Sequence, residues 1–231
     1  MSRPQWRPLA EIVDGIEHAC YSDASVQRRS VVPINRLNIL SQPSQGTVYE
    51  HLADVTHSNI HTARIGVAYA TVAGMRMFLG AFPDHQDVTF QWVIGLDDHI
   101  THPDAVKVAM ALPRSKVRLV RSTPGRTFHP KFISLKSRGK SQFAIIGSAN
   151  LTRSGLLTNS EVVVSLRTTD TKKKRTLNNA WAPLWASGET ATEKLLDSYV
   201  QEFRANRTAT TPPPEPHDEI LESDAVTIDP Q

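Results

Sequence analysis

The sequence contains little cysteine and no long apolar run. Its only cysteine is Cys20, so no disulfide bond can form within the chain, which is typical of proteins in a reducing cytoplasm. No stretch approaches the roughly 18 to 20 apolar residues that span a bilayer. Residues 1–15 also lack the apolar core of a secretory signal peptide. We therefore expect a cytoplasmic protein with no membrane segment.

Positive charge is missing from the end of the chain, where no Lys or Arg follows Arg207. Six of the 23 acidic residues lie there: Glu215, Asp218, Glu219, Glu222, Asp224 and Asp229. Residues 1–207 therefore hold 17 acids against all 26 Lys and Arg, a net charge of +9. This excess favours a polyanionic partner, although a solvated basic surface would have the same composition.

Apolar residues recur with helical and strand periods in an alternating order. Up to residue 121 the pattern predicts helices over 46–60, 72–82 and 103–112, and strands over 62–70, 88–96 and 116–121. Three strands then follow in quick succession, over 128–136, 141–147 and 160–166, and two helices end the pattern, over 176–187 and 190–205. Alternating helices and strands are the signature of a layered α/β fold.

These elements divide the chain into three parts. Residues 1–45 are expected to form an N-terminal extension, with a short helix over 9–21 and an extended or loop-like stretch over 30–40, where Pro33 breaks any helix. Residues 46–207 form one α/β domain. Residues 208–231 are rich in proline and acid, so we expect a disordered tail or a linker to a further domain.

A short stretch, FHPKF at residues 128–132, places a histidine and a lysine on alternate positions of an apolar run. In a strand, alternate residues point to one face, so His129 and Lys131 are expected to project together. An imidazole beside an ammonium is unfavourable in a buried place unless an anion lies between them, and phosphate is the obvious anion. The next strand ends in GSAN, where Ser148 and Asn150 again share one face.

Glu161 begins the third strand of this group, 11 residues after Asn150. A carboxylate there can accept a proton from one imidazole nitrogen and fix the tautomer of a histidine. Arg126 and Arg153 flank the two stretches. Each is either a contact to phosphate or DNA or an ordinary surface arginine.

The HPK and GSAN stretches resemble the motif of the phospholipase D superfamily, H-x-K followed by G-S-x-N. One position departs from the pattern, since Lys136 stands where many members carry Asp. That departure speaks against the lipid-cleaving branch. The nuclease branch often lacks this Asp and carries a Glu where Glu161 stands. Within it, the sequence looks most like the phospholipase D-type restriction endonucleases of the BfiI and NgoAVII/CglI kind.

The resemblance implies a phospholipase D-like α/β fold, with a central mixed β-sheet flanked by helices on both faces. It implies a nuclease domain that hydrolyses DNA without a metal or other cofactor, through a covalent phosphohistidine on His129. Lys131 and Asn150 would bind the phosphate oxygens, and Ser148 would support them. Glu161 would orient His129.

The resemblance also implies partners. The single-motif members of the family pair two copies at a shared site, which implies a homodimer with His129 of both chains at its two-fold axis. One histidine would attack phosphorus and the other would protonate the leaving oxygen. The tail would lead to a C-terminal DNA-recognition domain, and cleavage could require an ATPase or translocase subunit.

Other interpretations remain open. A phospholipase or phosphatidyl transferase, or a non-catalytic phosphate- or DNA-binding module, would show the same residues. His51, His57 and His61 could bind a metal or form a solvated helix face, and residues 97–99 (DDH) could bind a metal or form a polar loop. The run KKKR at 172–175 is either a solvated charge run or a contact to the DNA backbone.

Overall fold

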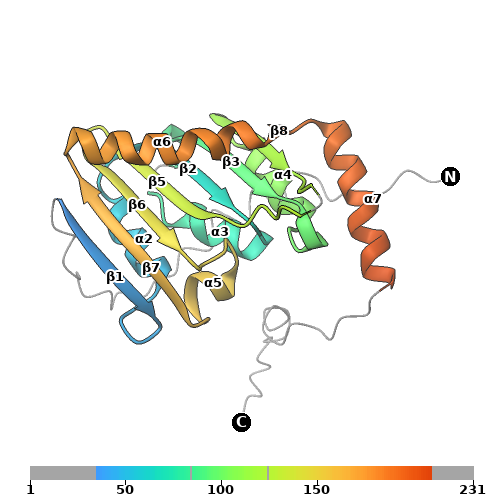
Figure 1. Cartoon of the computed structure of the whole chain (residues 1–231), viewed down its shortest axis with the longest axis horizontal. Coiled ribbons are helices and arrows are strands. Elements are labelled where there is room, and N and C mark those ends of the chain that lie inside the picture. Colours follow the sequence, from blue (N-terminus) through green and yellow to red (C-terminus); the bar gives the residue numbers. More distant parts are fainter. Residues whose placement is uncertain (1–34, 84, 124, 210–231) are drawn as a thin grey trace, which may run out of the picture.

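The computed structural model describes residues 35–83, 85–123 and 125–209 of the chain, which build one eight-stranded sheet with its covering helices (Figure 1). The strands are β1 (Arg36–Gln42), β2 (Ile60–Val67), β3 (Thr89–Gly95), β4 (Ser115–Val120), β5 (Lys131–Ser137), β6 (Gln142–Gly147), β7 (Glu161–Thr168) and β8 (Glu189–Thr190). The helices are α2 (Val48–Thr56), α3 (Val72–Gly80), α4 (Pro103–Ala111), α5 (Arg153–Leu157), α6 (Thr171–Ser187) and α7 (Glu193–Ala209), with the short turns η1 (His85–Asp87) and η2 (Asp97–His99).

The strand order across the sheet is β1-β7-β6-β5-β2-β3-β4-β8. The neighbours β2, β3 and β4 run parallel, and the other neighbouring pairs are antiparallel. The parallel strands are joined through α3 and α4, because a parallel pair needs a crossover connection. The sheet is therefore mixed, and β5 joins its parallel half to its antiparallel half.

Helices cover both faces of the sheet. On one face α2, α3, α4 and α5 pack over the larger core, whose fully buried side chains include Leu52, Phe78 and Trp92. On the other face α6 lies along the sheet (Figure 1) and buries Leu177 and Trp181 against it. The α/β class and the central mixed sheet with helices on both faces are thus confirmed.

The strand β1 lies inside the range 1–45 that was expected to be an extension outside the domain. It pairs with β7 along its whole length. Its last side chain, that of Gln42, is buried and donates to the carbonyl oxygens of Gly155 at 3.1 Å and Asn159 at 2.9 Å. The boundary expected at residue 46 therefore moves to the N-terminal side of β1.

Most element boundaries shift by a few residues, and two of these shifts bear on function. The strand expected over 128–136 begins only at Lys131, so His129 lies in the loop ahead of it. The helix expected from residue 176 begins at Thr171, because Asp170 caps it by accepting the Lys173 backbone N–H at 2.8 Å. The KKKR run therefore lies in the first turns of α6.

Residues 1–34 and 210–231 lie outside the described residues. The helix expected over 9–21 falls there, as does all but the start of the expected tail at 208–231. Among the residues that the structure describes, no helix has both the length and the apolar character needed to cross a bilayer.

Replacing Gly74 with alanine is expected to lower the free energy of unfolding by about 3 kcal/mol. Gly74 packs α3 against the chain that follows GSAN, and a Cβ there would lie 2.2 Å from the Leu151 carbonyl oxygen. Backbone must move to relieve that contact, and Leu151 directly follows Asn150. Urea unfolding followed by circular dichroism measures the change.

Gly80 provides the matched control for this test. It lies in the same helix, and a Cβ there would meet nothing within 4 Å. Gly80→Ala is therefore expected to raise the free energy of unfolding by about 0.5 kcal/mol, through the helix preference for alanine over glycine. Equal effects of the two substitutions would contradict the packing argument.

Candidate active site

The HPK and GSAN stretches meet at one edge of the sheet. β5 begins at Lys131, its neighbour β6 ends at Gly147, and the next strand β7 begins at Glu161. On the other side of β5, Lys131 lies opposite Val67, the last residue of β2. Four strand ends thus bring residues that are distant in sequence to one place.

The chain that follows β2 holds both stretches. The Ala68 backbone N–H donates to the Pro130 carbonyl oxygen at 2.9 Å. The carbonyl oxygen of the following residue, Tyr69, accepts from the Leu151 N–H at 3.1 Å. The backbone at residues 68–69 therefore lies between HPK and GSAN and fixes their spacing.

The side chains of His129 and Lys131 lie in contact, as expected, although His129 precedes the strand. The Lys131 Nζ lies 2.7 Å from Nδ1 and 2.9 Å from Nε2 of His129. A neutral imidazole has one acceptor nitrogen, so the ammonium can donate to only one of the two. Lys131 is 9% exposed, whereas His129 is exposed. An accessible imidazole thus rests on a buried ammonium.

Tyr69 is a residue of this site that the sequence analysis missed. Its ring meets the His129 ring edge-on, with the centroids 5.6 Å apart and the planes at 75°. Its hydroxyl donates to Asp98 Oδ2 at 2.8 Å. Burial, and then Asp98, raise the pKa of Tyr69 to about 12, so it stays protonated at neutral pH. Tyr69 therefore forms a fixed wall beside the imidazole.

Residues 97–99 organise the approach to the site. The Asp97 carboxylate accepts from the Ser122 backbone N–H at 2.9 Å, from the Ser122 hydroxyl, and from the Phe128 N–H at 3.2 Å. Asp97 therefore anchors the loop that leads into His129. Within the described residues, no three His, Cys, Asp or Glu side chains gather as a metal site, so neither metal interpretation of the sequence is supported.

Glu161 lies beside Ser148 and not beside His129. The Ser148 hydroxyl donates to Glu161 Oε2, and the Asn159 amide donates to Oε1 at 3.3 Å. In the described part of the chain no hydrogen bond joins Glu161 to His129. Within one chain, His129 contacts Lys131 and Tyr69, whereas Glu161 contacts the GSAN turn through Ser148.

The charge on Lys131 is not fully compensated. Burial lowers the pKa of the Lys131 ammonium, and the Glu161 carboxylate offsets part of that effect by raising it. Asn150 lines the same small cavity as Lys131. Its side-chain oxygen is buried and has no hydrogen-bond partner among the described residues, and a half-turn of the amide would place its NH2 group there instead. Asn150 thus keeps an unpaired polar atom close to the Lys131 ammonium.

The two flanking arginines lie apart from this cavity. Arg126 is exposed and lines an open groove of about 440 Å³ with Asp98, Arg121 and Glu202 among others. Arg153 is the first residue of α5 and is half-buried. Neither arginine lines the small cavity at Lys131. The other five residues that the sequence singled out lie at or beside the neighbouring ends of β5, β6 and β7: His129, Lys131, Ser148, Asn150 and Glu161.

Comparison with known proteins places the fold. No protein-family model and no curated protein matches the sequence. Among solved structures, Nuc from Salmonella typhimurium, described as a phospholipase D family member, matches with a TM-score of 0.51 at 17% identity, over 68% of this chain and 99% of its own. NucT from Helicobacter pylori matches with the same TM-score and the same coverage at 14% identity.

The chain has a phospholipase D-like fold. The fold implied by the HPK and GSAN stretches is therefore confirmed. The phospholipase D-like fold also places both stretches at one sheet edge, although at these identities the likeness concerns the fold alone.

Proposed function

We propose that the protein is a phosphodiesterase that hydrolyses DNA without a metal, through a covalent phosphohistidine on His129. The observation that carries the proposal is the pairing of an exposed imidazole with a buried, incompletely compensated ammonium, at the edge of a phospholipase D-like sheet. The imidazole can reach a substrate, and the ammonium can hold the phosphate charge where other enzymes use Mg²⁺.

The reaction then runs in two displacements. A His129 ring nitrogen attacks phosphorus, the P–N bond forms, and the P–O bond to the leaving strand breaks. A general acid gives that oxygen its proton. Water then attacks phosphorus, gives a proton to the same group, and releases the histidine. Lys131 and Asn150 hold the non-bridging oxygens in both steps.

A single chain supplies one histidine of the HPK type, so the second one must come from elsewhere. We propose a homodimer whose two copies of His129 share one site, one as nucleophile and one as general acid. From the resemblance of the sequence, we further propose that this domain is the nuclease domain of a restriction endonuclease. Residues after 207 would join it to a DNA-recognition domain, and an ATPase or translocase subunit would be its partner.

Cutting of DNA in excess EDTA tests the proposal. The protein is incubated with plasmid and with an end-labelled oligonucleotide, and the products are separated on denaturing gels. We expect cleavage in EDTA at the same rate as in Mg²⁺, because the phosphate charge is met by Lys131 and Asn150. Cleavage only with Mg²⁺ would contradict the metal-independent mechanism.

Two further substrates separate the alternatives. Cleavage of a short-chain phosphatidylcholine, with DNA left intact, would assign the site to a lipid phosphodiesterase or phosphatidyl transferase. Hydrolysis of bis-p-nitrophenyl phosphate without cutting of DNA would keep the phosphodiesterase chemistry and contradict the nuclease assignment. Binding of DNA with no hydrolysis of any diester would favour a non-catalytic module.

A further inference from the structure

A second group of cations lies at the opposite end of the sheet from His129. It consists of Arg64 on β2, Lys136 on β5 and Lys174 on α6. The register pairs Arg64 with Ser134, two positions before Lys136, so Arg64 and Lys136 share the face that α6 covers. Lys174 lies one helical turn before Asn178, whose side chain accepts from Arg64 Nη1 at 2.8 Å. The three cations therefore converge under the first half of α6.

All three side chains are half-buried and their charges act on one another. Burial lowers the pKa of Lys136, and the nearby charges of Arg64 and Lys174 lower it further. Burial also lowers the pKa of Arg64. Removing cations from water beside like charges is unfavourable. Burying these three cations side by side therefore lowers the stability of the fold.

The contacts of these cations are with neutral groups. Arg64 donates to the Gln91 amide oxygen at 3.0 Å as well as to Asn178. Lys174 donates to the Lys140 carbonyl oxygen at 3.0 Å. The ion pairs formed within the described residues include none of Arg64, Lys136 or Lys174. Their positive charge thus has no carboxylate counterion in the described chain.

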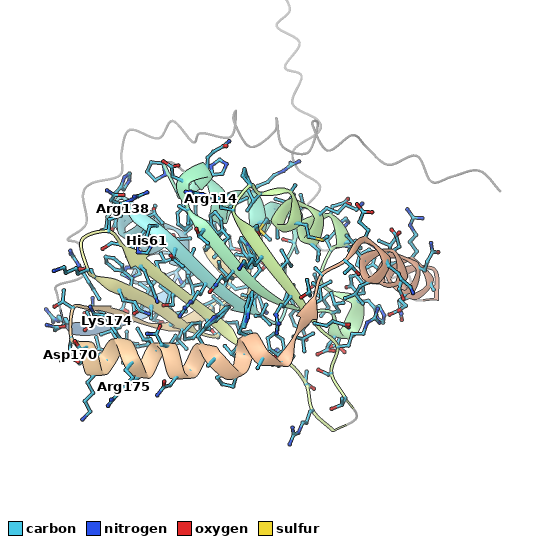
Figure 2. The ribbon with its side chains drawn as sticks, turned by 90° about the horizontal axis from the view of Figure 1, so that it is seen from above. His61, Arg114, Arg138, Asp170, Lys174 and Arg175 are labelled. Carbon is cyan, nitrogen blue, oxygen red and sulfur yellow. The ribbon has the colours of Figure 1, made fainter. Side chains whose placement is uncertain are left out.

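More positive charge surrounds this group. The labelled residues Lys174 and Arg175 lie toward the start of α6, with Arg138 at the same end of the sheet (Figure 2). Exposed cations here are Arg138, Lys140, Lys172, Lys173 and Arg175. Asp170 lies among them, but one of its oxygens is already engaged as the helix cap. An approaching anion therefore meets a field of one dominant sign.

We infer that Arg64, Lys136 and Lys174 form a second phosphate-binding site, which holds a backbone phosphate of a polynucleotide away from the reacting one. The inference rests on the proposed function for its choice of ligand. Lys136 lies five residues along β5 from Lys131, about 16 Å at roughly 3.3 Å per residue, and this odd spacing points the two side chains to opposite faces of the sheet. A small diester at His129 cannot span that distance, whereas a polynucleotide can.

The salt dependence of DNA binding tests this site. The full chain carries His129→Ala to prevent cutting, and binding to a labelled duplex of about 30 base pairs is followed by anisotropy between about 50 and 200 mM salt. Lys136→Gln combined with Lys174→Gln is expected to weaken binding and to reduce the slope of log K against log salt by about 1 to 2.

Two comparison variants make the result specific. Lys194→Gln with Arg207→Gln removes the same charge from exposed positions on α7, which lies at the other end of the molecule from the start of α6 (Figure 1), and is expected to leave the slope unchanged. Lys136→Arg with Lys174→Arg keeps the charge and is expected to keep the slope. Equal slopes for the Lys136/Lys174 and Lys194/Arg207 glutamine pairs would overturn the inference.

Two more measurements separate the possible failures. In the first, inorganic phosphate and an unlabelled oligonucleotide compete with the labelled duplex at equal concentrations of phosphate. Equal displacement by the two would reassign the site to a free anion and overturn the choice of a polynucleotide. Hydrolysis of bis-p-nitrophenyl phosphate by the unaltered protein tests the proposed function alone, because that diester occupies only the site at His129. If the unaltered protein does not hydrolyse this diester, but the Lys136/Lys174 glutamine pair still reduces the salt slope of DNA binding, the proposed function is contradicted and the second phosphate-binding site is supported.

Discussion

Replacing His129 with alanine is expected to slow phosphodiester hydrolysis by at least about 10⁴-fold. The imidazole is the nucleophile in the proposed mechanism, and in the homodimer the same substitution also removes the general acid. Single-turnover cleavage of a labelled oligonucleotide in EDTA measures the rate of the chemical steps. Binding of the same oligonucleotide, measured by anisotropy, is expected to persist, because the cations that attract the backbone remain.

A covalent intermediate gives this prediction a second readout. Labelled DNA attached to the intact protein is expected on a denaturing gel after an alkaline quench, and none is expected for His129→Ala. His57→Ala serves as the control, because His57 is exposed at the end of α2 and far along the chain from the site. A rate for His129→Ala within tenfold of the parent would contradict the role of His129 as nucleophile.

The sequence predicted that the HPK and GSAN stretches lie at strand ends, and the structure places these ends side by side. The apolar runs located β5, β6 and β7, and strand ends that are neighbours in a sheet necessarily bring their flanking residues together. His129, Lys131 and Asn150 therefore lie at one edge of the sheet even though His129 precedes its strand. The spacing of two short polar stretches tolerates an error of a residue or two in where a strand begins.

The contacts of Tyr69 and Glu161 could not be predicted in the same way. Tyr69 reaches His129 and Asp98 because β2 and β3 end at the edge where β5 begins, and no local pattern in the sequence encodes that strand order. Glu161 has the spacing of an orienting carboxylate, yet its side chain is held by Ser148 and Asn159. Spacing along a chain identifies a carboxylate near the site but does not choose its partner.

The strand β1 was predicted only as part of an extended or loop-like stretch outside the domain, for a different reason. Edge strands contribute few buried side chains, and two of the apolar residues of β1, Leu37 and Ile39, are 58% and 65% exposed. Its buried side chain is the polar Gln42. Hydrophobic periodicity therefore gives little evidence for β1, whereas the backbone pairing with β7 and the Gln42 amide hold it in place.

Replacing Lys131 with methionine is expected to separate catalysis from stability. The rate of phosphodiester hydrolysis should fall by about 10² to 10³-fold, the loss typical for a preorganised charge or donor that holds a transition state. The free energy of unfolding should not fall, because methionine has a similar length and carries no charge into a site where Lys131 is 9% exposed. Lys116→Met, an exposed position on β4, should leave the rate unchanged.

The pH dependence of the free energy of unfolding tests whether the buried Lys131 charge destabilises the fold. Burial lowers the folded pKa of Lys131 below its ordinary 10.5, so between those two values the unfolded chain binds the proton and the folded chain does not. The free energy of unfolding of the parent should therefore rise with pH across that window relative to Lys131→Met, as urea unfolding at a series of pH values would measure. A parallel pH dependence in the two proteins would mean that the Lys131 ammonium costs the fold nothing, and the argument that it awaits a phosphate would lose its physical basis.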